Sequence, residues 1–303
     1  MSMRAAAAAP AAPSTSPGRP AEIEEWSNRR LIHPLSRALT GLLIPTGVSP
    51  NAVSAMGAGL AAIAACVFVL APWPASGLVG LLFLLAWHVF DGADGDLARR
   101  TGRASTNGEL VDGICDHLGQ AAVYIAFAVI LSPSLGGWAW LLAAASGLSR
   151  AVQASAYETC RRKYRRWVYG AGWIDQDLRR LEAADASPGQ RTQIALARAY
   201  MSVAGLVSAD DRALEAAMSR ASATGPEAAA AARALYRERM LPLVKQAAIL
   251  CANYRSLAAG LSIVVGRPVW FLLYELVLLN GALVWLRWAE GRANRAVTAA
   301  LEG

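Results

Sequence analysis

The chain has 303 residues, a mean hydropathy of +0.33, and 55% hydrophobic against 17% charged residues. This composition is too apolar for an ordinary soluble domain, and the length allows about six membrane spans of roughly 20 residues each. The net charge is +7, but the basic residues gather beside apolar segments and no DNA- or RNA-binding motif is present, so we expect membrane lipids as partners and no nucleic acid.

The first 48 residues divide into two parts. Residues 1–20 are rich in Ala, Pro and Ser and are expected to form a disordered tail. Residues 21–48 place apolar side chains at roughly helical spacing with arginines between them, which predicts a juxtamembrane amphipathic helix lying in the membrane interface. An ordinary amphipathic core helix is the alternative, but the position just before a membrane span favours the interface.

Six apolar segments follow, separated by turns rich in Pro and Gly. They cover about 52–71, 77–99, 108–131, 137–157, 241–265 and 269–288. We therefore predict an all-α, polytopic membrane protein with six transmembrane helices, an N-terminal interfacial amphipathic helix and a small cytoplasmic helical insert. The expected units are 49–170 with the first four spans, 171–239 as the soluble insert, and 240–303 with the last two spans and a C-terminal tail.

The basic residues predict the orientation. They lie before the first span, between the second and third, after the fourth and after the sixth, whereas the opposite turns carry only Arg267. The positive-inside rule then places both termini in the cytoplasm. We expect an integral protein of a bacterial inner (plasma) membrane whose active site opens to the cytoplasm.

Acidic residues gather at the ends of the second and third apolar segments. Asp91 and Asp94 are three residues apart, and Asp112 and Asp116 are four apart, so each pair lies on one helical face. Two helices joined by a short loop would hold four carboxylates at one level, which is typical of a divalent-metal site. A set of structural ion pairs is the alternative, but few arginines lie nearby and unpaired buried acids are costly.

The residues between these acids carry a family resemblance. Asp94-Gly95, Ala98-Arg99, Gly108, Asp112 and Asp116 follow one another at the spacing of the CDP-alcohol phosphotransferase signature, and Asp91 supplies its leading acid. The resemblance covers residues 91–116. It implies that Asp91, Asp94 and Asp112 bind two Mg²⁺ or Mn²⁺ ions, and that Asp116 is the general base and also contacts a metal.

The resemblance also implies where the nucleotide lies. Small residues on the second span would let a nucleotide, or the third span, approach closely. The residues implied to lie beside the CDP moiety are Gly92, Gly95, Ala98 and Gly108, with Arg99 on the diphosphate. Asp96 points away from Asp94 on an ideal helix, so we leave it out of the metal site.

Polar residues also occur deep in later spans. Arg150 and Arg161 share one helical face of the fourth span, and Arg255 lies near the middle of the fifth. Because arginines at membrane depth are costly, we expect these three to line the pocket of the acceptor or lipid phosphate. Ion pairs with Glu158 or Glu275 are the alternative. His117 would read the acceptor or pack as a polar side chain.

The resemblance implies an enzyme that takes a CDP-linked donor and an alcohol acceptor. We expect a phospholipid synthase that moves a phosphatidyl group from CDP-diacylglycerol to a polar alcohol and releases CMP, with inositol phosphate or glycerol phosphate favoured by the arginines. The alternative is transfer of a head group, as from CDP-ethanolamine, to diacylglycerol or a ceramide-like lipid. A cation or proton transporter is a more distant alternative. A relay would spread its acids across the bilayer, whereas these acids gather at one side of the membrane. The resemblance further implies a homodimer.

Overall fold

The computed structural model describes residues 20–104, 106–170 and 212–303. Every regular element in these ranges is helical, and five helical segments are long and apolar enough to cross a membrane. The chain is therefore an all-α polytopic membrane protein, as the sequence predicts. The tail expected over 1–20 and the first part of the expected insert, 171–211, lie outside the described residues except for Pro20.

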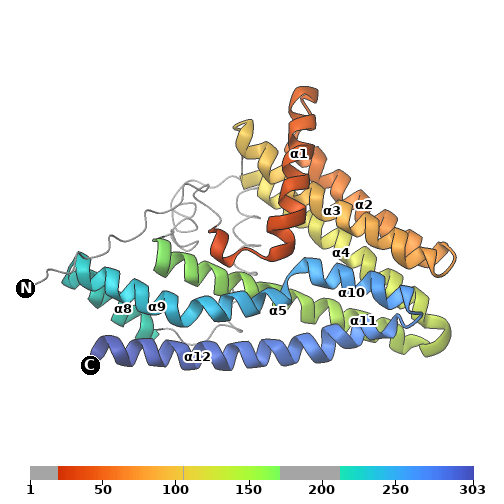
Figure 1. The fold of residues 1–303 in the computed structure, drawn as a ribbon. Coiled ribbons are helices and arrows are strands. Elements are labelled where there is room, and N and C mark those ends of the chain that lie inside the picture. Colours follow the sequence, from red (N-terminus) through yellow and green to blue (C-terminus); the bar gives the residue numbers. More distant parts are fainter. Residues whose placement is uncertain (1–19, 105, 171–211) are drawn as a thin grey trace, which may run out of the picture.

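Three neighbouring helices surround the acidic motif, whose aspartates lie on the second and third of them. They are α2 (Pro50–Leu70), α3 (Ala75–Arg100) and α4 (Thr106–Leu135), and they run side by side in Figure 1. Their contact is close because Gly119 leaves room: a Cβ there would lie 2.9 Å from the Cβ of Ala61. Phe68, Trp87 and Phe127 fill the core between them.

The fourth predicted span is α5 (Gly137–Tyr169), which runs on as one helix well past the expected end of the span. It is less apolar than the five segments that meet the criteria for a membrane span. Its polar residues Ser146, Arg150 and Gln153 are buried inside the bundle. Within the described residues, length and hydropathy therefore identify five candidate spans, and the prediction of six depends on α5.

The fifth predicted span is broken. In place of one helix over 241–265, α9 (Pro226–Ala247) ends in the turn η4 (Ala248–Leu250), and α10 (Ala252–Val264) starts a new helix. Cys251 has extended backbone at the junction. The guanidinium of Arg255 donates to the carbonyl of Leu250 at 3.3 Å and so supplies a donor to the end of this helix.

The sixth predicted span follows a short turn. It starts as α11 (Val269–Leu273), passes through the π-helical turn η5 (Tyr274–Leu279) and continues as α12 (Asn280–Glu302). The C-terminal part of α12 packs with α5, α9 and α8 (Arg212–Thr224) in a second, separate core. These helices lie together in Figure 1, on the side away from α2. The boundary expected between residues 239 and 240 falls inside α9.

The N-terminal segment ends in a helix that packs against α3. After η1 (Ala21–Ile23) and the π-helical turn η2 (Asn28–Ile32), α1 (His33–Leu43) packs against α3. Ser36 and Thr40 donate hydrogen bonds to the carbonyls of Val89 (2.9 Å) and Ala93 (3.3 Å). The opposite side exposes Trp26, Leu31, Leu35 and Leu42, as an interfacial helix requires.

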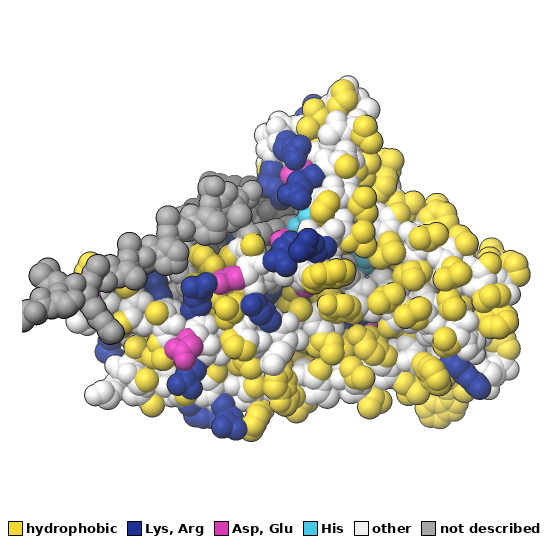
Figure 2. Space-filling view, in the orientation of Figure 1, with side chains coloured by type: hydrophobic (Ala, Val, Ile, Leu, Met, Phe, Trp, Pro, Cys, Tyr) yellow, Lys and Arg dark blue, Asp and Glu magenta, His cyan; other side chains and the backbone are white. Residues whose placement is uncertain are grey.

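The molecular surface separates charge from apolar area. In Figure 2 one half of the visible face is almost entirely hydrophobic, whereas basic and acidic side chains gather over the other half. Cys66 is exposed on the apolar surface of α2, whereas Cys160 and Cys251 are buried. An apolar surface that faces lipid accepts a cysteine as readily as a protein core does.

Candidate metal and active site

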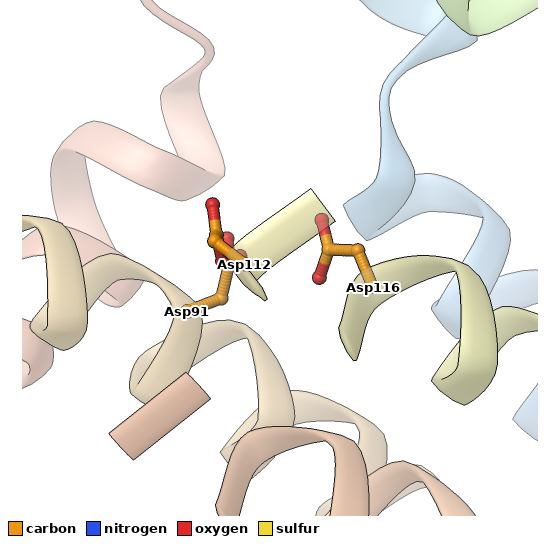
Figure 3. Close-up of side chains that lie close together, drawn as sticks. All are labelled: Asp91, Asp112 and Asp116. Atoms are coloured by element: carbon orange, nitrogen blue, oxygen red, sulfur yellow. The ribbon is translucent and has the colours of Figure 1, made fainter. Parts of the chain in front are cut away.

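Three aspartates from two helices form the centre of the site. Asp91 comes from α3, and Asp112 and Asp116 come from successive turns of α4. One carboxylate oxygen of each lies within 4.8 Å of the others, and the three side chains turn toward a common space in Figure 3. The structure thus brings together three of the carboxylates that the sequence spacing predicts to lie at one level.

Asp94 adjoins this triad. Its side chain lies within hydrogen-bonding reach of Asp112, as that of Asp91 does with Asp116. Asp94 is buried and also accepts a hydrogen bond from the hydroxyl of Ser54 on α2. The four predicted carboxylates therefore form one continuous group that joins three helices.

The chemistry of this group fits divalent cations. Two oxygens bound to one ion at about 2.0–2.6 Å lie at most about 5 Å apart, and the triad satisfies this limit. In the described part of the chain, no Lys or Arg forms an ion pair with Asp91, Asp94, Asp112 or Asp116. Four carboxylates held together without a paired cation are costly unless metal ions neutralise them.

Asp96 is separate from this group, as the sequence predicts. One of its carboxylate oxygens lies 3.0 Å from the Nε of Arg100, and the other lies 3.9 Å from Arg99. The residue faces the exposed end of α3 and neutralises the basic residues there. Asp96 can therefore serve as a control: it is an acid on the same helix that lies outside the metal site.

The small residues of α3 have different neighbours. A Cβ at Gly92 would lie 2.5 Å from the hydroxyl oxygen of Ser36, so the missing side chain leaves room for α1. The prediction that Gly92 lies beside the nucleotide or the third span is therefore wrong. The atoms nearest to a Cβ at Gly95 would be those of the Arg99 guanidinium, the first of them at 3.3 Å. Ala98 is partly exposed and Arg99 is exposed, so within the described structure this end of α3 is accessible. Gly108 lies in the first turn of α4.

Two arginines are buried behind the aspartates. Arg255 forms an ion pair with Glu275 and donates to Gln153 at 2.7 Å. Arg150 has one terminal nitrogen, Nη1, that is buried without a hydrogen-bond partner in the described structure, and Asp116 is among the charged groups that act on it. Both arginines line one cavity of about 30 Å³, which is room for about one water molecule.

The other two candidate residues lie farther out. Arg161 contacts Glu158 at 3.4 Å and stacks over the ring of Tyr157. The Nδ1 atom of His117 lies 2.6 Å from the carbonyl oxygen of Gly113 one turn back, and its ring is exposed. The predicted ion pairs are thus present in part: Arg161 pairs with Glu158 and Arg255 pairs with Glu275, whereas no ion pair of Arg150 is found within the described structure.

Ser54 is the site residue that the sequence analysis missed. A hydroxyl in an otherwise apolar helix indicates a polar contact. However, the spacing of residues along one segment does not show which other helix that hydroxyl contacts. The same holds for the buried pair formed by His88 and Ser256, whose side chains meet at 2.7 Å. Contacts between helices require the packing, which sequence periodicity leaves open.

Comparison with known proteins agrees with this geometry. Residues 48–176 match the family model described as CDP-alcohol phosphatidyltransferase. No sequence among the curated proteins matches the chain. The matched range covers α2 to α5 and contains all four aspartates and Ser54.

Proposed function

Residues 48–176 belong to the CDP-alcohol phosphatidyltransferase family, whose members transfer substituted phosphate groups, and from this we propose that the enzyme moves a phosphatidyl group from CDP-diacylglycerol to the hydroxyl of a polar alcohol. The products would be a phosphodiester lipid and CMP. The observation that carries the proposal is the group of three carboxylates from α3 and α4 with oxygens within 4.8 Å of one another.

We propose Asp91, Asp94, Asp112 and Asp116 as the metal ligands. Two divalent ions, Mg²⁺ or Mn²⁺, would neutralise the pyrophosphate and stabilise the displaced CMP when bound. The gathering of the acids at one level supports this role over a cation or proton relay, because a relay needs acids distributed across the bilayer.

The protein's own groups would position the reactants. The acceptor oxygen attacks the phosphorus that carries diacylglycerol, the bond from that phosphorus to the CMP oxygen breaks, and the hydroxyl proton passes to the carboxylate of Asp116. Asp116 suits this role because it lies between the other acids and the buried Arg150. Ser54 would hold Asp94 in one orientation by donating to it.

The open end of α3 supports binding of the nucleotide there. Gly95 and Ala98 leave the backbone approachable, and Arg99 extends over Gly95 with its guanidinium partly exposed. A planar guanidinium matches the paired oxygens of a diphosphate. We therefore propose this end, together with Gly108, as the site of the CDP moiety.

The buried arginines favour a phosphorylated acceptor. Glu275 neutralises Arg255, which leaves Arg150 as a second buried guanidinium beside Asp116. An anionic group bound near Arg150 would supply the missing hydrogen-bond acceptor and neutralise the charge. This is why inositol phosphate or glycerol phosphate is preferred over an acceptor without phosphate.

Labelled donors test the choice of substrate. The purified protein would be given CDP-diacylglycerol labelled in its acyl chains with either acceptor, and separately CDP-ethanolamine labelled in its head group with diacylglycerol. We expect label in a phosphodiester lipid only from CDP-diacylglycerol. Lipid labelling only from CDP-ethanolamine would overturn the donor and support the alternative. Absence of transfer from both donors, with specific cation flux in liposomes, would support a transporter.

A further inference from the structure

A second cavity lies at the end of the bundle opposite the aspartates. It has a volume of about 430 Å³, which is within the range of about 300–1,000 Å³ found for ligand pockets. The ends of α2 and α4 and the turn between α10 and α11 enclose it. Its lining includes Phe68, Trp73, Ser76, Ile130, Pro133 and Ile263.

The inner side of the cavity is buried, and its rim is exposed at the surface of the bundle. Phe68, Ser76 and Ile263 are buried, whereas Val69 and Val129 on its rim are exposed. Trp73 forms part of its wall, and its indole nitrogen donates to the carbonyls of Ile263 (3.0 Å) and Val264 (3.1 Å). This hydrogen-bonded wall joins the α2–α3 turn to the α10–α11 turn, and so keeps the cavity formed.

The level of the cavity is the membrane interface. The 21 residues of α2 span about 31 Å at 1.5 Å per residue, close to the thickness of the hydrocarbon core. The aspartates lie toward one end of this length and the cavity at the other. Exposed tryptophans surround this end, namely Trp73, Trp138, Trp140 and Trp270, and such a belt is typical of the lipid head-group level.

One basic residue lies between two residues that line the cavity. Arg267 is flanked by Gly266 and Pro268, which both line the cavity, and it is exposed. It is the single charged residue in the three turns at this end, over 70–76, 131–138 and 264–271. No hydrogen bond or ion pair of its guanidinium is found within the described structure.

From these features we infer a binding site for an anionic phospholipid, separate from the catalytic site. One acyl chain occupies the apolar cavity, and the phosphate accepts hydrogen bonds from the guanidinium of Arg267. The charge supports this occupant, because a lone cation beside an apolar cavity at the head-group level complements a lipid with a phosphate and a chain. The lipid belongs to the leaflet opposite the aspartates, so it is a structural ligand and not the donor.

Native mass spectrometry with defined lipids tests this site. The full-length protein in detergent would be titrated with phosphatidylglycerol, and with diacylglycerol of the same chains, which lacks the phosphate. Two variants remove the two halves of the site: Arg267→Gln removes the cation, and Ile130→Trp fills the cavity. The matched controls are Arg239→Gln, at an exposed arginine of α9, and Val284→Trp, at an exposed position of α12.

The expected pattern separates the two contributions. Phosphatidylglycerol binds the wild type and both controls alike, Ile130→Trp loses one bound lipid, and Arg267→Gln weakens binding roughly tenfold, as expected for a lost hydrogen bond to a charged group. Diacylglycerol binds weakly and does not distinguish Arg267→Gln from wild type. Equal phosphatidylglycerol binding by all five proteins, or loss in the controls as well, would overturn the inference. The measurement needs no catalytic activity, so its failure leaves the proposed function unaffected.

Discussion

Arg150 is the residue whose environment most directly bears on the acceptor. Its buried Nη1 has no hydrogen-bond partner within the described part of the chain, and Asp116 and Glu275 are among the charged groups that act on it. Because a buried N–H without an acceptor is costly, an anionic group bound beside Arg150 would stabilise it.

Replacing Arg150 should therefore act on the acceptor. We expect Arg150→Gln to raise the KM for a phosphorylated acceptor about tenfold or more, because a hydrogen bond to a charged group is lost, with a smaller effect on the KM for the CDP-linked donor. Steady-state kinetics with each substrate varied separately measures this. Arg162→Gln is the control, since Arg162 pairs with Glu158 at 2.9 Å. A fall in kcat with both KM values unchanged would contradict the assignment.

Gly92 illustrates how one residue positions an element. Any side chain there would meet Ser36, so α1 can lie on α3 only because Gly92 has none. We expect Gly92→Ala to destabilise the protein by about 1–3 kcal/mol through overpacking. The thermal unfolding midpoint in detergent would fall relative to Gly59→Ala, a helical position with no neighbour within 4 Å. A midpoint equal to that of the control would show that α1 does not pack as described.

At the scale of elements, the N-terminal segment is held to the extramembrane helices by Glu22. Its carboxylate accepts hydrogen bonds from Tyr164 and Tyr169, each at 2.6 Å, and from Arg237. Burial alone would raise the pKa of Glu22, but the hydrogen bonds from Arg237 and the two tyrosines outweigh it and hold the pKa below its ordinary value.

This lowered pKa predicts a pH dependence. A carboxyl whose pKa is lower in the folded state stabilises that state above its unfolded pKa, about 4.3, and the contribution is lost as the pH falls through the folded pKa. We expect Glu22→Gln to lower the unfolding midpoint at pH 7, and the gap to wild type to narrow below about pH 4. Glu238→Gln, an exposed position on α9, should show no gap. A gap that widens toward low pH would contradict the role of Glu22.

Helix boundaries show what the sequence could predict at this scale. Hydropathy located α2, α3 and α4 to within a few residues, because apolar length is a property of each segment alone. The break at Cys251 was missed, since an apolar run does not record that Arg255 caps the end of η4. The grouping of four acids followed from spacing, whereas Ser54 and the neighbour of Gly92 depend on how different helices pack.

At the scale of the whole molecule, the number of spans depends on α5. Its 33 residues extend about 50 Å at 1.5 Å per residue, more than the roughly 30 Å of the hydrocarbon core. The polar residues that lower its hydropathy are buried within the bundle, so they do not meet lipid. We therefore propose that α5 is the sixth span and that both termini lie on the side of the aspartates. The distribution of the basic residues predicts that this side is the cytoplasm.

Cysteine labelling tests this topology. In a variant without native cysteines, a cysteine at Gly136 and one at Tyr169 should react with a membrane-impermeant maleimide from opposite sides of sealed vesicles. A cysteine at Gly303 should label from the same side as Tyr169. Labelling of positions 136 and 169 from one side would exclude α5 as a span. The homodimer implied by the sequence resemblance stays a prediction.

Release of CMP by the purified protein shows whether the four aspartates form a catalytic metal site. The purified protein would be assayed with CDP-diacylglycerol and glycerol phosphate or inositol phosphate, with Mg²⁺ or Mn²⁺ and again after chelation. We expect metal-dependent release that Asp116→Asn lowers by about 10²–10⁴-fold, the contribution typical of a general base. Asp96→Asn should stay close to wild type, because Asp96 pairs with Arg100 outside the site. Release that persists without metal, or an equal loss in both variants, would contradict the account.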